Sequence, residues 1–156
     1  MSDDLNYLPA SPATGVTRVR LTTLQKAEFL RGLELFSEAS VEDLYQLAAI
    51  AQEVEFPAQQ TIFREEDIGD AFYIVVQGKI ECTSEARKIH VVVGPGGSVG
   101  VYSVLTREPR LATARALEDT FAIAIGAEDL YNLLSNNAEI MAGIIKFFVK
   151  KVGMAP

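Results

Sequence analysis

Residues 95–116 read PGGSVGVYSVLTREPRLATARA, and this stretch decides the fold class. It joins a glycine-led turn, a helical turn at VYSVL and a loop that contains Arg110. Backbone N–H groups at the start of a helix point outward and carry partial positive charge, which suits an anion. The guanidinium of Arg110 can donate to two phosphate oxygens at once. The stretch therefore predicts an anion-binding loop in which Gly100 faces the ligand.

Both residues also have a simpler interpretation. Gly100 can be an ordinary glycine at a helix start. Arg110 stands among Arg107, Glu108 and Arg115, so it can belong to a solvated ion pair that contributes little. The proline before Arg110 and the small residue two places after it favour an ordered loop.

The sequence around this stretch alternates between apolar and polar residues with a period of two. Turn residues separate the alternating segments about 8–12 residues apart, which is typical of an antiparallel sandwich or barrel. Gly69, Gly78 and Gly96 stand where strands must reverse, and we expect positive φ angles there. The predicted strands are VEF at 54–56, TIF at 61–63, AFYIVVQ at 71–77, KIECT at 79–83, IHVVV at 89–93, TARAL at 113–117 and FAIAI at 121–125.

Helical spacing flanks these strands on both sides. Apolar residues recur every three or four positions over 24–36, and Ser40 predicts the N-cap of a second helix. After the strands, a short helix from 128 to 134 breaks at 136–137, and a longer helix follows over 140–152. The predicted fold class is mainly β with flanking helices.

Bulk properties predict one domain and exclude several classes of function. We expect a flexible arm at 1–20, a domain at 21–152 and a short tail at 153–156. A net charge of −7 opposes a nucleic-acid surface. The single cysteine, Cys82, excludes an internal disulfide and fits a reducing compartment. Without an apolar leader or an apolar run of 18 residues, the sequence predicts a cytoplasmic protein that contacts no membrane.

Catalytic chemistry is not supported by the residue types present. His90 is the only histidine, and its apolar neighbours place it on the outer face of a strand. One histidine cannot anchor a metal site or complete a nucleophilic triad. The carboxylates at 65–67 are typical of a solvated turn and not of an acid–base pair. We therefore expect no metal, no cofactor and no enzyme activity.

Three ordered segments carry a family resemblance: FLRGLELFSEASVEDLYQLAAIA at 29–51, FPAQQTIFREEDIGDAFYIVVQGKIE at 56–81 and PGGSVGVYSVLTREPRLATARALEDT at 95–120. Together they resemble the cyclic nucleotide-binding domain of catabolite-activator-type regulators, kinase regulatory subunits and gated channels. The resemblance covers about residues 26–151. It implies a double-stranded β-helix, that is a jelly-roll-like β-roll, with N-terminal helices and C-terminal lid or hinge helices. It also implies a regulatory domain for cyclic AMP or cyclic GMP.

The resemblance assigns roles to residues of the phosphate-binding cassette, residues 95–116. It implies that Arg110 binds the exocyclic phosphate oxygens and that Gly100 offers backbone contact to the sugar. Ala112 and Thr113 are implied to help through a backbone N–H and a hydroxyl. The predicted ligand-binding residues are Gly100, Val101, Tyr102, Arg110, Leu111, Ala112 and Thr113.

The cassette departs from the family pattern at the position after its glycine. Val101 stands where the family has a glutamate that accepts the ribose 2′-hydroxyl. A hydrogen bond to a charged acceptor contributes about 1.5–3 kcal/mol, so its loss predicts about 10- to 150-fold weaker binding. Leu111 replaces the usual serine or alanine, and Val99 replaces the usual aromatic. Either the domain binds a cyclic nucleotide weakly or another anion, or the pocket is vestigial and the barrel is a scaffold.

The last predicted helix, over 140–152, is the candidate for transmitting ligand binding to a partner. Its apolar residues cover more than one stripe, so it can pack on its own domain and on something else. The resemblance implies that this helix caps the nucleotide or pairs with its copy, which predicts a homodimer or an effector domain as partner. A DNA-reading helix-turn-helix would need a further segment after Lys151, so we expect no nucleic acid contact through this chain.

Overall fold

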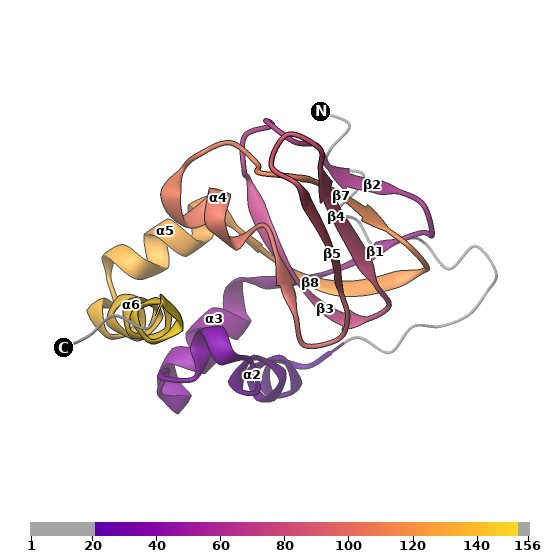
Figure 1. Ribbon diagram of the computed structural model, residues 1–156. Helices are drawn as coiled ribbons and strands as arrows, with labels where there is room; N and C mark the ends of the chain where they lie inside the picture. Colours follow the sequence, from indigo (N-terminus) through magenta and orange to yellow (C-terminus); the bar gives the residue numbers. More distant parts are fainter. Residues whose placement is uncertain (1–20, 153–156) are drawn as a thin grey trace. The chain divides into compact units, whose positions relative to one another are not determined.

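The computed structural model describes residues 21–152 (Figure 1). The arm predicted at 1–20 and the tail predicted at 153–156 lie outside the described residues. The described residues divide into two compact units. Residues 52–127 form a β unit, and residues 21–51 with 128–152 form a helical unit.

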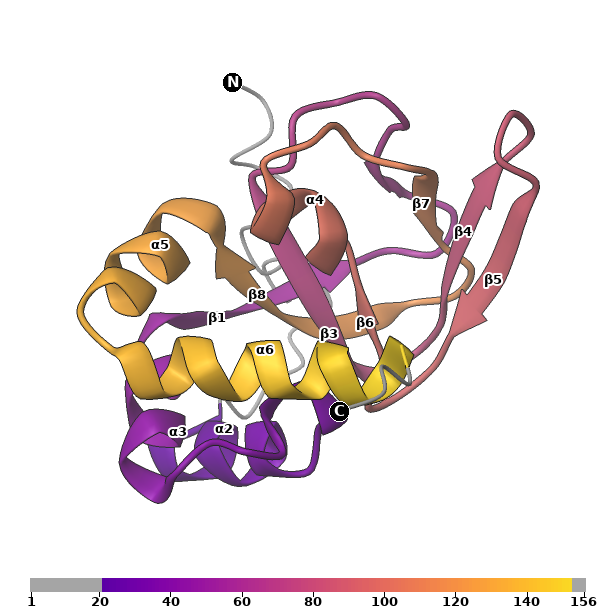
Figure 2. The ribbon, with the colours of Figure 1, turned by 60° about the vertical axis from the view of Figure 1, so that its left-hand side comes forward.

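The β unit contains two antiparallel four-stranded sheets. The first has the strand order β1-β8-β3-β6, and the second has the order β2-β7-β4-β5. Figure 2 shows β4 and β5 side by side as a hairpin. This architecture confirms the predicted mainly-β class and its jelly-roll-like topology. The strands are β1 (Ala51–Phe56), β2 (Thr61–Phe63), β3 (Ala71–Gln77), β4 (Ile80–Ser84), β5 (Ile89–Val93), β6 (Ser98–Val99), β7 (Thr113–Ala116) and β8 (Thr120–Gly126).

The predicted strands are all present, with shifts of a few residues at their ends. The largest shift is in β1, which begins at Ala51, three residues before the predicted start. The buried positions Ala51 and Glu53 flank the exposed Gln52, but a buried glutamate hides this alternation from sequence reasoning. The sequence also missed β6, because its two residues are too few to show a period.

Small and aromatic side chains together fill the interior of the β unit. Three rings lie in a row: Phe56 meets Tyr73 edge-on at 5.5 Å, and Phe63 stacks on Tyr73 at 6.3 Å between ring centroids. Phe63 lies on the short strand β2 and places its ring beside the cassette. The buried cluster consists of Val54, Phe56, Ile62, Ala71, Tyr73, Val75, Ile80, Val99, Ala114, Ala116, Ala122 and Ala124.

The glycine predictions are confirmed at two of three positions. Gly78 and Gly96 have φ angles of 105° and 88°, as expected at strand reversals. The prediction of a positive φ at Gly69 is wrong, since Gly69 is not among the residues with positive φ. Glycine is needed at position 69 for lack of space, because a Cβ there would lie 2.5 Å from the Ser103 hydroxyl oxygen.

The helical unit begins with two capped helices. Thr22 and Gln25 form a capping box at the start of the first, and Ser40 with Asp43 forms another at the start of the second. The Ser40 prediction is therefore confirmed. The helical pattern over 24–36 is interrupted, because the first helix ends at Gly32 and a separate 3₁₀ turn follows. These elements are α2 (Thr23–Arg31), η1 (Glu34–Phe36) and α3 (Val41–Ile50).

Two helices follow the strands, as predicted. They are α5 (Ala127–Ser135) and α6 (Ala138–Val152). The break between them falls at Asn136 and Asn137, whose side-chain amides donate to carbonyls one turn earlier, at Asn132 and Leu133. Helix α6 packs on η1 in the helical unit. Over residues 21–152, no helix combines the length and apolarity that crossing a bilayer requires.

Candidate functional site

The cassette folds as a strand, a short helix and a loop. Strand β6 pairs with β3, and Gly100 then turns the chain into helix α4 (Val101–Thr106). Gly100 has a φ of 87°, which a glycine adopts without strain. The helix ends at Arg107, and the loop that follows leads through Arg110 into β7.

Arg110 is buried within the β unit, with 1% of its surface exposed. Its Nη1 donates to the Ser103 hydroxyl at 2.9 Å and to the Gly100 carbonyl at 3.3 Å. Its Nη2 donates to the Ala71 carbonyl at 2.6 Å and to an Asp70 carboxylate oxygen at 3.3 Å. The guanidinium also lies 3.8 Å from the centroid of the Phe63 ring. The alternative of a solvated surface pair is therefore wrong for this arginine.

Gly100 and Arg110 are brought together, and each limits the other. A Cβ at Gly100 would lie 2.5 Å from Arg110 Nη1 and 3.4 Å from the Ala71 carbonyl oxygen. The chain therefore needs glycine here to admit the guanidinium, whether or not a ligand is present. The predicted contact between Gly100 and a ligand stays a prediction.

The other predicted residues lie on α4 and at the end of the loop. Val101 is the first residue of α4 and is half-buried, whereas Tyr102 is 48% exposed. Leu111 is half-buried and Ala112 is buried. Thr113 opens β7, and its hydroxyl accepts a hydrogen bond from the Glu65 backbone N–H at 3.0 Å.

Sequence reasoning missed the residues that hold Arg110. Asp70 and Ala71 precede the cassette by about 40 positions along the chain, and β3 carries them to it. A conspicuous signal was available only for Asp70, whose carboxylate is a natural partner for an arginine. Ser103 gave no signal, because a serine within a short helix is unremarkable by residue type.

The inner face of the second sheet is open at β5. Cys82 lies opposite Val91 on β5 and opposite Ala114 on β7. Ala114 is fully buried, yet Val91 on the same face is 50% exposed. Burial and the nearby Glu81 carboxylate raise the pKa of the Cys82 thiol to about 11, so the thiol is neutral near pH 7. This part of the roll offers an apolar, uncharged wall.

The outer face of the same sheet carries a charged pair. His90 is exposed, as predicted, and its Nε2 lies 2.9 Å from Glu81, which also pairs with Arg115 at 3.0 Å. The hydrogen bond from Arg115 and that with His90 lower the pKa of the Glu81 carboxyl. Within residues 21–152, no group of three or more histidine, cysteine or carboxylate side chains is arranged to hold a metal ion.

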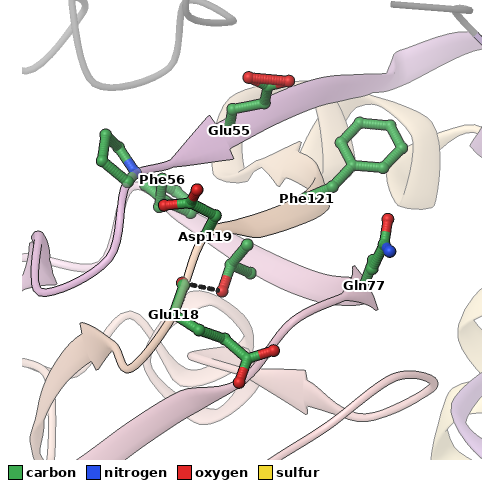
Figure 3. A pocket seen from close by; sticks show the side chains of 8 residues that line it. Glu55, Phe56, Gln77, Glu118, Asp119 and Phe121 are labelled. Atoms are coloured by element: carbon green, nitrogen blue, oxygen red, sulfur yellow. Dashed lines mark hydrogen bonds between the residues drawn. The ribbon is translucent and has the colours of Figure 1, made fainter.

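Two cavities in the β unit relate differently to the predicted residues. The first cavity has a volume of about 380 Å³, and no predicted ligand-binding residue lines it (Figure 3). It is lined by Glu55, Phe56, Pro57, Gln77, Glu118, Asp119, Thr120 and Phe121. Another of about 530 Å³ is lined by the predicted Thr113, by Glu65 and by residues around the β4–β5 turn.

The family model named cyclic nucleotide-binding domain matches residues 53–137. This match covers more than half of the 156 residues and includes every predicted ligand-binding position. The chain belongs to the cyclic nucleotide-binding domain family. Domains of this family are regulatory ligand-binding modules, and the predicted resemblance is confirmed.

Individual relatives of this cyclic nucleotide-binding domain agree with the family match. The CRP-like cAMP-activated global transcriptional regulator of Mycobacterium tuberculosis is 22% identical over 129 residues, which are 80% of this chain and 58% of that protein. The crystal structure of the N-terminal domain of a transcriptional regulator from Streptomyces coelicolor has a TM-score of 0.70 and 29% identity. That similarity covers 80% of this chain and 90% of the other.

One similar structure contains a cyclic nucleotide. The regulatory domain of Toxoplasma gondii PKA in its co-crystal structure with cAMP has a TM-score of 0.66 and 27% identity, over 75% of this chain and 46% of that chain. The chain spans less than two thirds of the length of the Mycobacterium regulator. The similarity therefore does not extend the activities of the whole relatives to this chain.

Proposed function

We propose that the β unit is a regulatory module that binds a cyclic nucleotide, cyclic AMP or cyclic GMP, with reduced affinity. The observation that carries this proposal is the position of Arg110. A permanently charged guanidinium lies buried beside Gly100, at the turn into α4. A cation in such surroundings interacts strongly with an arriving phosphate, because little water screens the pair.

The reduced affinity follows from the residue after Gly100. Val101 has no acceptor for a ribose 2′-hydroxyl, so that hydroxyl would lose one charged hydrogen bond on binding. Leu111 adds bulk where the family has a small residue. We therefore expect binding about 10- to 150-fold weaker than that of a domain with a glutamate at this position.

The proposal is tested by isothermal titration calorimetry with cyclic AMP and cyclic GMP. The variant Arg110→Lys retains a positive charge but cannot make the paired donations of a guanidinium. The matched control is Arg115→Lys, since Arg115 lies on the outer face of the second sheet and pairs with Glu81. We expect heat of binding for the wild type and for Arg115→Lys, and none for Arg110→Lys. Flat titrations of the wild type at millimolar nucleotide would contradict the proposal.

A second candidate function is a structural domain that has lost its ligand. The observation that favours it is the set of acceptors that Arg110 already has within the chain, two for each terminal nitrogen. A phosphate would have to replace some of these contacts. Flat titrations together with an intact fold would favour this candidate over the first.

Under either candidate, we propose that α6 provides the output by pairing with a second copy of this chain or with an effector domain. Apolar side chains on one side of α6 remain 39–55% exposed, at the i, i+4, i+7 and i+8 spacing of a helix stripe. They are Met141, Ile145, Phe148 and Val149. Sedimentation of Ile145→Glu tests self-association, and Leu24→Glu on α2, where Leu24 is 53% exposed, is the control. We expect the first variant to be monomeric and the second to sediment like the wild type.

A further inference from the structure

Arg87, in the turn between β4 and β5 (Figure 2), reaches across to the end of the cassette. We propose that Arg87 is a positioning residue that holds the Leu111–Ala112 peptide in the orientation that binds an anion. The proposal deepens the function proposed above and rests on it. No residue of the β4–β5 turn was among the predicted site residues.

The Arg87 guanidinium joins three groups on two segments. Its Nη1 donates to a Glu65 carboxylate oxygen at 2.7 Å and to the Leu111 carbonyl at 3.2 Å. Its Nη2 donates to a Glu66 carboxylate oxygen at 3.1 Å. A rigid guanidinium fork can satisfy several acceptors with fixed relative directions, which an ammonium cannot. The Leu111 carbonyl is therefore held by a side chain whose own direction is fixed by two carboxylates.

Glu65, one of the two carboxylates, is anchored at its side chain and at its backbone. The Ser84 hydroxyl donates to its carboxylate at 2.7 Å, and the Arg87 backbone N–H donates to the same Ser84 hydroxyl at 3.1 Å. The Glu65 backbone N–H donates to Thr113 of the cassette at 3.0 Å. The β4–β5 turn is thus linked through Glu65 to the residue that follows Ala112.

The loop over residues 64–67 also pairs directly with the backbone of the cassette. The Glu66 N–H donates to the Arg110 carbonyl at 2.9 Å, and the Arg110 N–H donates to the Asp67 carbonyl at 2.8 Å. These bonds fix the backbone on the N-terminal side of Leu111. The Leu111–Ala112 peptide thus lies between two anchored residues, Arg110 and Thr113.

The planarity of the peptide bond converts a contact to Leu111 into an orientation of Ala112. The Leu111 carbonyl and the Ala112 N–H belong to one trans peptide unit, so they point in opposite directions. When Arg87 holds the carbonyl toward itself, the N–H is directed away from Arg87. The Arg87 side chain is 37% exposed, whereas Ala112 is buried with 8% of its surface exposed. That N–H is the donor that the cassette is expected to offer to the phosphate.

Loss of Arg87 would release this peptide without unfolding the domain. The ion pairs of Arg87 are partly exposed to solvent, and such surface pairs contribute little to stability. The Leu111 carbonyl would then accept from water in either orientation of the peptide. If the binding orientation falls to about one tenth of the population, the apparent affinity falls about tenfold.

The experiment compares Arg87→Ala with Arg115→Ala. Arg115 on β7 is a matched control, because its side chain is 43% exposed, pairs with Glu81 on the outer face of the second sheet and is not one of the predicted ligand-binding residues. Calorimetry measures the affinity for cyclic AMP, and ¹H–¹⁵N spectra of the ligand-free protein report on the Ala112 amide. For Arg87→Ala we expect about tenfold weaker binding, a shifted Ala112 resonance and a melting temperature close to that of the wild type. For Arg115→Ala we expect wild-type affinity and an unmoved Ala112 resonance.

A third variant separates charge from geometry. Arg87→Lys keeps a positive charge beside Glu65 and Glu66, but one ammonium cannot reach both carboxylates and the Leu111 carbonyl together. We expect it to bind cyclic AMP as weakly as Arg87→Ala. Full affinity in Arg87→Lys would overturn the proposal, because charge alone would then suffice.

The two readouts distinguish failure of this inference from failure of the proposed function. Unchanged affinity in Arg87→Ala, or an unmoved Ala112 resonance, overturns the role of Arg87. If the wild type binds no cyclic nucleotide, the proposed function fails and the amide resonance alone decides. A shifted Ala112 amide resonance in Arg87→Ala but not in Arg115→Ala then supports the role of Arg87 as a positioning residue. An unmoved resonance in Arg87→Ala overturns that role.

Discussion

A single buried guanidinium ties the cassette to strand β3. Arg110 makes four hydrogen bonds from its two terminal nitrogens and rests on the Phe63 ring. Removing it takes the donors away from the buried Ser103 hydroxyl and Ala71 carbonyl and leaves a cavity. We expect Arg110→Ala to lower the free energy of unfolding by about 2–4 kcal/mol, measured by urea denaturation. The control Arg115→Ala should change it by less than about 1 kcal/mol, and equal losses in both variants would contradict the buried network.

Three glycines of the cassette region separate backbone strain from steric conflict. A Cβ would meet nothing within 4 Å at Gly94 or Gly96, but only Gly96 has a positive φ. Gly100 has both a positive φ and a would-be Cβ 2.5 Å from Arg110. Thermal melts should therefore rank the alanine variants Gly94→Ala, Gly96→Ala and Gly100→Ala in order of increasing loss, with about 1 kcal/mol for the strain alone. A Gly100→Ala variant as stable as Gly96→Ala would argue against the tight contact.

The reactivity of the Cys82 thiol tests how deeply the second sheet buries it. Burial raises its pKa to about 11 from the ordinary value of 9.0, so little thiolate exists at pH 8. We expect alkylation by iodoacetamide to be slow at pH 8 and to rise with a midpoint near pH 11. The pKa of the thiol is higher in the folded protein than in the unfolded chain. The contribution of the neutral thiol to stability is therefore fully present below pH 9 and is lost as the pH rises toward 11. Rapid alkylation at pH 7 would contradict this prediction, because it would mean that Cys82 is more exposed in solution than in the structure.

At the scale of elements, the helical unit has its own titrating contact. The Lys150 ammonium on α6 lies 2.9 Å from the Glu38 carboxylate, just after η1. The hydrogen bond and charge of Lys150 lower the pKa of Glu38 from its ordinary value of 4.5. This contact therefore contributes to stability above pH 4.5 and is lost as the pH falls through the lower, folded pKa.

The titration of Glu38 tests that contact directly. In Lys150→Ala, the pKa of Glu38 should rise toward 4.5, as followed by NMR of the side-chain carboxyl. Lys79→Ala, in the β unit, is the control and should leave the Glu38 pKa unchanged. The same Glu38 pKa in Lys150→Ala and in the wild type would mean that Lys150 on α6 and Glu38 are not in contact in solution.

Sequence patterns predicted most elements because each has a local signal. The continuous apolar run of β3 and the Ser40 cap each lie within a few consecutive residues, and both elements were predicted correctly. The partners of Arg110 were not predictable in the same way, since Asp70 and Ala71 are 40 and 39 positions away along the chain. The hydrogen bond from Arg87 to Leu111 spans 24 positions, and the alternation of apolar and polar residues does not predict it.

At the scale of the molecule, residues 21–152 divide into a β unit and a helical unit. The β unit contains every predicted ligand-binding residue, and the helical unit contains the exposed stripe of α6. Ligand binding and self-association can therefore be measured as separate properties. A variant of α6 such as Ile145→Glu should alter sedimentation, whereas a variant of Arg110 should alter nucleotide affinity.

Calorimetric titration of cyclic AMP into the wild type and into Val101→Glu tests the central claim most directly. The variant restores the carboxylate that the family places after the cassette glycine. The account predicts weak but measurable binding by the wild type and an affinity at least about tenfold higher in Val101→Glu. Equal affinities would contradict the placement of the ribose at residue 101, and no heat from either protein would contradict nucleotide binding itself.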